Sequence, residues 1–365
     1  MDFLSYFARD YRGARAKFLE ACLGAGLEPE TFENPAPAPD GRPVYTDVAV
    51  AGPADAENVL LATAGTHGVE GFCGSGAMVG WLRSREDRLL PPGVRAVLVH
   101  AVNPHGFAWL RRVNEDNVDL NRNFLDHDKG AWPANAEYTL LHPVLVPEKW
   151  DDASRQAAYA ACEDFAARHG RFALQSAVSR GQYDHADGLF YGGRAATWSN
   201  RMFREVIARH VVGARRLCFL DFHTGLGPYG TAELISAGIP GTPLGERLHG
   251  WFGHGVSSPA AGNSSSPSLS GVIRAAFNGE LPDTEITSAT VEFGTYPVEQ
   301  MLEAVRADNW LHLRGEPGSD QWYQIKAMIR RSFYPDEDDW KELVYVRARQ
   351  VLRAGARGLA GLPRP

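Results

Sequence analysis

Two apolar runs joined by a helix-like segment restrict the fold of this chain more than any other feature of its sequence. Residues 58–64 and 94–102 are mostly apolar and are bounded by turn residues, and residues 74–85 between them have the character of a helix. Such runs are typical of strands that are covered on both faces, as in sheets with parallel strands. Residues 215–222 and 286–293 have the same character, and residues 44–50 form a further extended run. The pattern predicts an α/β fold, with a mixed twisted sheet flanked by helices.

The remaining segments extend this predicted fold. Residues 3–23 place apolar side chains at spacings of three and four, which predicts an N-terminal helix within residues 1–25. Residues 127–195 contain helix-like stretches and no convincing strand, and we expect them to form a helical insertion. Residues 256–271 form a polar, Ser-rich loop. A chain of 365 residues is long enough for two domains, but we expect one, residues 1–365, enlarged by the helix and the insertion.

Charge and cysteine content exclude several classes of protein. A formal net charge of −7 argues against a nucleic-acid partner, because such proteins carry clusters of basic side chains. The four cysteines are widely separated, so neither a disulfide framework nor a thiolate zinc site is indicated. The sequence contains no apolar run long enough for a membrane span and no secretory signal. We therefore expect a cytoplasmic protein that binds neither nucleic acid nor membranes.

Two predicted strands end next to a histidine. His67 and Glu70 follow the run that ends at Ala64, and His223 follows residues 217–222. In α/β sheets, functional groups gather beyond the carboxyl ends of the strands. An imidazole and a carboxylate three residues apart on a turn can face one point, and two His with one Glu form the ligand set of a catalytic zinc site. These three residues could therefore hold a divalent metal ion, with Zn²⁺ the natural choice. For His67 and Glu70 alone, a surface pair that flanks a glycine turn is the plainer interpretation.

Other polar residues lie close to the same predicted strand ends. Asp221 shares a strand face with the second histidine and can orient it. Glu292 interrupts an apolar strand, so if it is buried it needs a cation, a water molecule or a hydrogen-bond donor. Residues 119–123, DLNRN, combine an Asn with an Arg whose fork of donors suits a carboxylate. Arg111 or Arg112 could face a developing oxyanion, although a surface turn with ion pairs is the plainer interpretation of this segment.

Taken in order, these motifs resemble the zinc carboxypeptidase (M14-type) superfamily, whose relatives include aspartoacylase and succinylglutamate desuccinylase. The motifs are HGVE at 67–70, DLNRN at 119–123 after an arginine, HTG at 223–225 and VEFGT at 291–295. Residues 65–76, 103–124 and 188–193 are still more similar to the DUF2817 branch of that superfamily. The resemblance spans about residues 44–300 and implies a zinc carboxypeptidase-like fold.

The resemblance implies a metal-binding role for three residues. His67, Glu70 and His223 match the zinc ligands of the superfamily. Asp119 matches a residue that orients the first zinc histidine. One zinc ion per chain is therefore the expected cofactor.

The resemblance also implies roles in catalysis and substrate binding. Glu292 matches the general base, which passes its proton to the leaving amine. Asn121 and Arg122 match the pair that binds a substrate carboxylate. The arginine before them matches the residue that stabilises the oxyanion, and we favour Arg112 over Arg111 for this role.

The expected reaction is zinc-dependent hydrolysis of an amide bond next to a free carboxylate. We expect a metallocarboxypeptidase that acts on short or modified peptides. An N-acyl amino acid deacylase of the aspartoacylase type is the alternative, because the same groups serve both reactions. A third hypothesis is an inactive module that binds a carboxylated ligand, but such a module has no use for Glu292 as a base.

One family feature is missing from the sequence. The peptidases of the superfamily carry a mobile tyrosine ahead of the catalytic glutamate, whereas residues 256–290 contain no Tyr. Tyr191, Tyr229 or Tyr296 could take its place. The Ser-rich loop occupies this part of the sequence instead, which leaves the substrate specificity open.

Overall fold

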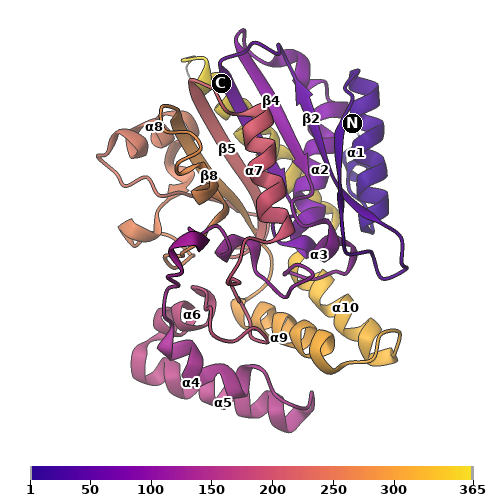
Figure 1. Cartoon of the computed structure of the whole chain (residues 1–365), viewed down its shortest axis with the longest axis vertical. Coiled ribbons are helices and arrows are strands. Elements are labelled where there is room, and N and C mark those ends of the chain that lie inside the picture. The colour runs from indigo at the N-terminus through magenta and orange to yellow at the C-terminus, as the bar shows by residue number, and fades with distance from the viewer. Residues whose placement is uncertain (1, 363–365) are drawn as a thin grey trace.

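Eight strands form one mixed sheet, in the order β1-β2-β4-β3-β5-β8-β6-β7 (Figure 1). The computed structural model describes residues 2–362, so Met1 and residues 363–365 of the expected domain lie outside the described part. The strands are β1 (Glu30–Asn34), β2 (Val44–Ala51), β3 (Asn58–Ala64), β4 (Val94–His100), β5 (Arg216–Gly225), β6 (Ala232–Ile235), β7 (Val256–Ser257) and β8 (Glu285–Gly294). Strands β4, β3, β5 and β8 are parallel, whereas β1, β2 and β6 each pair antiparallel with a neighbour. The predicted mixed sheet is confirmed.

Helices cover both faces of this sheet. They are α1 (Tyr11–Ala25), α2 (Gly71–Arg83), α3 (Pro104–Ala108), α4 (Ala136–Leu145), α5 (Asp152–His169), α6 (Arg171–Ser179), α7 (Trp198–His210), α8 (Pro243–Phe252), α9 (Val298–Arg314), α10 (Asp320–Phe333) and α11 (Asp338–Leu359). Leu60 and Ala62 of β3 pack in one apolar cluster with α1, α2 and α11, while Val59 and Leu61 pack in another with α7. Because successive side chains of a strand point to opposite faces, an apolar run such as β3 requires helices on both sides.

The predicted insertion is helical. Helices α4, α5 and α6 lie within residues 127–195, where β-type backbone pairing is limited to one isolated bridge between Gln182 and Tyr191. In Figure 1 these helices gather with α9 and α10 beyond one end of the sheet, below the strands. None of the helices within residues 2–362 is long and apolar enough to cross a membrane.

The structure corrects the predicted start of the N-terminal helix and adds three strands. A 3-10 turn forms at Phe3–Tyr6, and α1 begins only at Tyr11, because the Asp10 carboxylate accepts a hydrogen bond from the backbone N of Gly13 (2.8 Å) and caps the helix. The sequence does not predict β1, β6 or β7. β1 and β7 are the edge strands, and β6 lies between β8 and β7. All three are short and lack continuous apolar runs, so their pairing partners rather than their own composition define them.

The turn after β3 packs on α3 with no room for a side chain at Gly68. A Cβ atom there would lie 2.1 Å from the carbonyl carbon of Gly106 and 2.2 Å from the backbone N of Phe107. The backbone N of Val69 also donates a hydrogen bond to Arg111 O (2.8 Å). The turn is therefore fixed against the segment that follows β4.

Gly68→Ala is expected to lower the free energy of unfolding by about 1–3 kcal/mol or more, because the new methyl group would force two backbone segments apart. Chemical denaturation of the two purified proteins measures the difference. Gly24→Ala is the matched control, since a Cβ atom at Gly24 of α1 meets nothing within 4 Å. That change should leave stability equal or slightly higher, because Ala favours a helix more than Gly does. Equal stability of Gly68→Ala and the unaltered protein would contradict this packing.

Candidate active site

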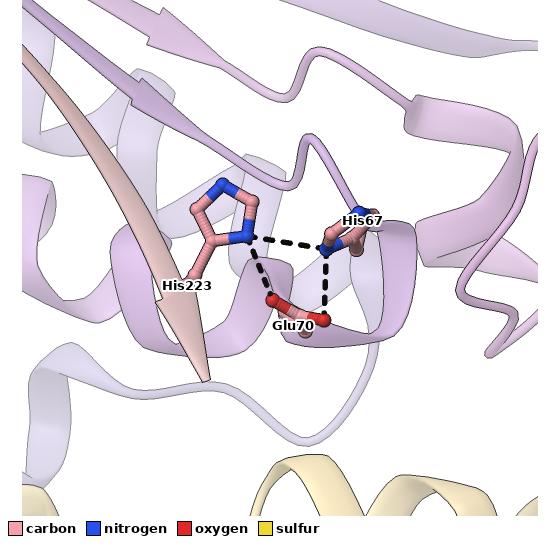
Figure 2. A group of neighbouring side chains, drawn as sticks. All are labelled: His67, Glu70 and His223. Atoms are coloured by element: carbon pink, nitrogen blue, oxygen red, sulfur yellow. Dashed lines mark hydrogen bonds and ion pairs between the residues drawn. The ribbon is translucent and has the colours of Figure 1, made fainter. Parts of the chain in front are cut away.

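The side chains of His67, Glu70 and His223 meet at the carboxyl ends of β3 and β5 (Figure 2). His67 Nδ1 lies 2.9 Å from Glu70 Oε1, and His223 Nδ1 lies 3.1 Å from Glu70 Oε2. The two Nδ1 atoms are 3.1 Å apart. All three side chains are buried. The sequence places His223 just after its strand, whereas the structure places it within β5.

Each of the two imidazoles has a carboxylate on its far side. His67 Nε2 lies 2.9 Å from Asp119 Oδ1, and His223 Nε2 lies 2.5 Å from Asp221 Oδ2. Asp221 is itself held by the hydroxyl of Thr66, which donates to its Oδ1 (2.9 Å). A carboxylate that accepts a hydrogen from Nε2 leaves the Nδ1 lone pair for a ligand. Both Nδ1 atoms thus face the Glu70 carboxylate, an arrangement that fits a shared cation.

The electrostatics of the cluster also fit a cation. Burial alone would raise the pKa of Asp119, but the positive charges of His67 and Arg112 hold it well below its usual value. Burial likewise disfavours the protonated form of His223, but Asp221 raises its pKa well above the usual value. Positive charge is therefore stabilised between these carboxylates. His, His and Glu offer the nitrogen and oxygen atoms that Zn²⁺ prefers.

A second group of possible ligands, His142, His185 and Asp187, lies on the insertion. The two imidazoles are stacked, with ring centroids 4.0 Å apart and an interplanar angle of 21°. Because the lone pair of an imidazole nitrogen lies in the plane of the ring, stacked rings do not direct their lone pairs at one point. The buried group at the strand ends is therefore the better candidate metal site.

Glu292 lies next to His223 on the neighbouring strand. The two residues are register partners in the parallel pair β5 and β8, so their side chains leave the sheet side by side. Glu292 is buried, and its Oε1 accepts a hydrogen bond from the backbone N of Leu226 (2.9 Å). Burial, followed by the negative charge of Glu70, raises the pKa of Glu292 to about 7. This carboxyl group can therefore take up and release a proton near neutral pH.

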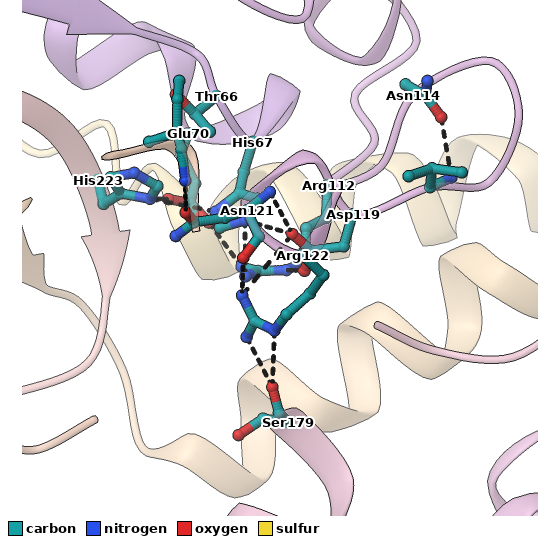
Figure 3. A network of polar contacts seen from close by, with 12 residues as sticks. Thr66, His67, Glu70, Arg112, Asn114, Asp119, Asn121, Arg122, Ser179 and His223 are labelled. Atoms are coloured by element: carbon teal, nitrogen blue, oxygen red, sulfur yellow. Dashed lines mark hydrogen bonds and ion pairs between the residues drawn. The ribbon is translucent and has the colours of Figure 1, made fainter. Parts of the chain in front are cut away.

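Arg112, and not Arg111, reaches the cluster (Figure 3). Arg112 Nη1 lies 2.8 Å from Glu70 Oε1, and its Nε lies 3.1 Å from Asp119 Oδ2. Arg111 points elsewhere, into a buried ion pair with Asp308 (3.1 Å). The two neighbouring arginines thus have different surroundings, and the geometry favours Arg112 for a role at the site.

Asn121 and Arg122 belong to the same cluster and contact Asp119 Oδ1 through the backbone N of Asn121 (2.9 Å) and Nη1 of Arg122 (3.9 Å) (Figure 3). Arg122 Nε and Nη2 donate to Ser179 O (3.2 and 2.6 Å), and Nη1 donates to Asn121 O (2.7 Å). A guanidinium has more N–H groups than these three bonds use. The carboxylate of Asp119 lies 3.9 Å from Nη1, but it also pairs with Arg112 and His67. Asn121 Oδ1 accepts a hydrogen bond from the backbone N of Ile273 (2.9 Å). The pair remains able to bind an anion.

One cleft of about 580 Å³ contains these groups. Its walls come from α5 and α6 of the insertion, from α9 and from the Ser-rich loop. The candidate site residues that line it are His67, Glu70, Arg112, Asn121, Arg122, His223 and Glu292. Asp119 and Asp221 lie behind the histidines and do not line it. A cleft of this size is typical of sites for small ligands.

The tyrosine in this cleft is one that the sequence does not suggest. Tyr191, Tyr229 and Tyr296, the three substitutes for the missing loop tyrosine, are not among the residues that line it. Tyr159 of α5 lines it instead. No local pattern distinguishes Tyr159 from other helix residues, because its position depends on how the insertion packs.

Two further residues contact the site residues, and the sequence motifs do not point to their contacts. The hydroxyl of Thr63 donates to Asp221 Oδ1 (2.6 Å), and the ring of Phe190 lies 5.2 Å from the Arg112 guanidinium carbon. Thr63 could have been found, since a polar side chain near the end of an apolar strand signals a buried partner. Phe190 lies in the segment 188–193 that resembles DUF2817, but no local pattern shows that its ring lies near Arg112, because the two residues are far apart in the chain.

Comparison with known proteins gives a family and several distant structural likenesses. No curated protein matches the chain. The structure is similar to carboxypeptidase A from Helicoverpa armigera, with 14% identity over 88% of this chain and 73% of that chain and a TM-score of 0.46. It is also similar to murein-tripeptide amidase from Escherichia coli O157, with 18% identity over 80% of this chain and 95% of that chain and a TM-score of 0.37. A third similar structure is succinylglutamate desuccinylase from Chromobacterium violaceum, with 15% identity over 86% of this chain and 72% of that chain and a TM-score of 0.38.

The family described as "Protein of unknown function (DUF2817)" matches residues 7–347. This match includes all the strands of the sheet and all the residues of the candidate site. The resemblance of residues 65–76, 103–124 and 188–193 to DUF2817 is thereby confirmed. The chain belongs to the DUF2817 family.

Proposed function

We propose that this protein is a zinc-dependent hydrolase that cleaves an amide bond next to a free carboxylate, and that it acts as a carboxypeptidase on short or modified peptides. One observation carries the proposal. His67, Glu70 and His223 present ligand atoms within 4.8 Å of one another, in the same cleft as the buried carboxyl group of Glu292. A metal site beside a proton acceptor is the minimum that metal-assisted hydrolysis needs.

Three residues would hold the zinc ion, and two others would orient them. Asp119 and Asp221 fix the imidazoles of His67 and His223 through their Nε2 atoms, so that Nδ1 of each ring would be the atom that holds the metal. Zinc bound there would supply a Lewis acid for the scissile carbonyl group and lower the pKa of a water molecule. Three protein ligands are the number found in catalytic zinc sites.

Glu292 serves as the general base in this proposal. Its carboxylate takes a proton from the attacking water and passes it to the nitrogen of the leaving amine. The Leu226 backbone N–H holds one oxygen of this carboxylate in place, while burial raises its pKa towards neutral. A base whose pKa lies near the working pH can both accept and return a proton efficiently.

Two arginines supply positive charge at different points of the cleft. Arg112, held by Glu70 and Asp119, stabilises the negative charge that develops on the carbonyl oxygen. Arg122, held by the carbonyl oxygens of Ser179 and Asn121, binds the free carboxylate of the substrate together with Asn121.

The size of the cleft favours a peptide over an N-acyl amino acid. Its volume is about 580 Å³, and α5, α6 and α9 line it in addition to the site residues, so the cleft has room for a ligand larger than an N-acyl amino acid. A deacylase needs less space, because its substrate is a single amino acid with a short acyl group. Deacylation therefore remains the alternative outcome of the substrate experiment below.

Loss of a ligand is expected to abolish metal binding. After zinc is supplied, the unaltered protein should hold one zinc ion per chain by elemental analysis. His223→Ala should hold almost none, because two ligands rarely retain zinc. His142→Ala, in the second His and Asp group, is the control and should keep the full zinc content. The reverse pattern would move the metal site to the insertion.

Glu292→Gln should lower the rate of hydrolysis by about 10²–10⁴-fold while the zinc content stays the same, because the amide cannot accept the proton. Mass spectrometry of N-acylated dipeptides and N-acyl amino acids measures the rate and separates carboxypeptidase from deacylase activity. Glu163→Gln is the control, since Glu163 lines the same cleft but pairs with Arg171. Unchanged activity of Glu292→Gln would rule out the proposed mechanism.

Activity is expected to fall as the pH falls through the pKa of Glu292, because only the ionised carboxylate is a base. Burial and Glu70 raise this pKa from 4.5 to about 7, whereas a bound cation lowers it. The acidic midpoint of kcat/KM should therefore lie between these two values. The residual activity of Glu292→Gln should lack this midpoint. If kcat/KM falls at low pH in the same way in the unaltered protein and in Glu292→Gln, a group other than Glu292 causes the fall.

A further inference from the structure

Six arginines line the cleft, and five of them lie within ion-pair distance of a carboxylate. Arg112 pairs with Glu70 and Asp119, Arg122 with Asp119, Arg155 with Glu303, Arg171 with Glu163, and Arg306 with Glu303. These pairs balance most of the positive charge in the cleft. The sixth arginine, Arg274, is different.

Arg274 has no ion pair, side-chain hydrogen bond or ring contact with any residue in the described range 2–362. Water still reaches the side chain, which is exposed within the cleft. The surrounding protein removes enough of that water to lower the pKa of the guanidinium, and no neighbouring carboxylate opposes the shift. An unpaired cation that is partly desolvated is costly, so it marks a position where an anion would be stabilised.

The backbone around Arg274 is attached to the segment that contains Asn121. The preceding residue, Ile273, donates its N–H to Asn121 Oδ1 (2.9 Å), and Phe124 N donates to Gly271 O (2.9 Å). A Cβ atom on Gly271 would lie only 2.1 Å from Arg122 O, which shows how closely the two segments pack. Arg274 therefore lies in the same wall of the cleft as the pair proposed to bind the substrate carboxylate.

We propose that Arg274 binds a second carboxylate of the substrate, on the side chain of the residue whose terminal carboxylate meets Asn121 and Arg122. This inference rests on the proposed function and narrows its substrate class to peptides that end in an acidic residue. A carboxylate can accept two parallel hydrogen bonds from a guanidinium, which gives both affinity and orientation. Glu163 and Glu303 of the cleft already have arginine partners and do not compete for Arg274.

Binding of two ligands that differ only in charge tests the inference. The full-length protein with Glu292→Gln, supplied with zinc, is titrated calorimetrically with N-acetylglutamate and with N-acetylglutamine, so that neither ligand is consumed. We expect the glutamate derivative to bind about 10- to 100-fold more tightly, the range typical of a hydrogen-bonded charge pair. Adding Arg274→Gln should remove this preference, and adding Arg274→Lys should retain part of it. Adding Arg171→Gln, the control, should leave the preference intact.

Hydrolysis measured in parallel separates this inference from the proposed function. The zinc-supplied enzyme with Glu292 intact is assayed on N-acetyl-Ala-Glu and N-acetyl-Ala-Gln. If the protein binds N-acetylglutamate more tightly than N-acetylglutamine and Arg274→Gln removes this preference, the result supports the inference. If this holds but neither peptide is cleaved, the proposed function alone is wrong. Equal binding of the two ligands, no binding of either, or a preference that survives in Arg274→Gln overturns the inference. If the binding test overturns the inference but both peptides are cleaved at equal rates, the proposed function is still supported.

Discussion

Backbone pairing between β5 and its two parallel neighbours is the interaction on which the candidate site depends. Ala64, the last residue of β3, pairs with Phe222, so the turn with His67 and Glu70 emerges beside β5. On the other side, the register pairs His223 with Glu292. A shift of one residue in either pair would turn alternate side chains to the opposite face of the sheet. The apolar runs buried on both faces oppose such a shift, and in this way the core determines the geometry of the site.

Burial of several carboxylates around two histidines has a thermodynamic consequence. Each buried charge is unfavourable unless a partner of opposite charge or a hydrogen-bond donor is close. Asp119 has Arg112 and His67, and Asp221 has His223 and two threonine hydroxyls. The cluster thus stabilises positive charge at the Nδ1 atoms. Glu292 behaves differently: burial, followed by the negative charge of Glu70, raises its pKa, and the positive charge of His223 and the hydrogen bond from Leu226 N offset only part of this shift.

The insertion contributes more than a wall. Ser179, the last residue of α6, accepts two hydrogen bonds from Arg122, and Phe190 lies against Arg112. Both arginines of the proposed mechanism are therefore oriented by residues from this segment. The insertion, together with Arg274 later in the chain, thus determines where positive charge lies in the cleft. We therefore expect substrate preference to depend on the insertion more than on the sheet.

The sequence by itself determined the central strands, the helical insertion and the polar residues at the strand ends, because these follow from local apolar periodicity and from short motifs. It did not determine the short strands β1, β6 and β7, which depend on neighbouring strands for their hydrogen bonds. Nor did it decide between Arg111 and Arg112. Only the tertiary structure did so, because Asp308, the partner that takes Arg111 away from the site, lies almost two hundred residues further along the chain. Long-range pairing of this kind depends on packing, which no local pattern records.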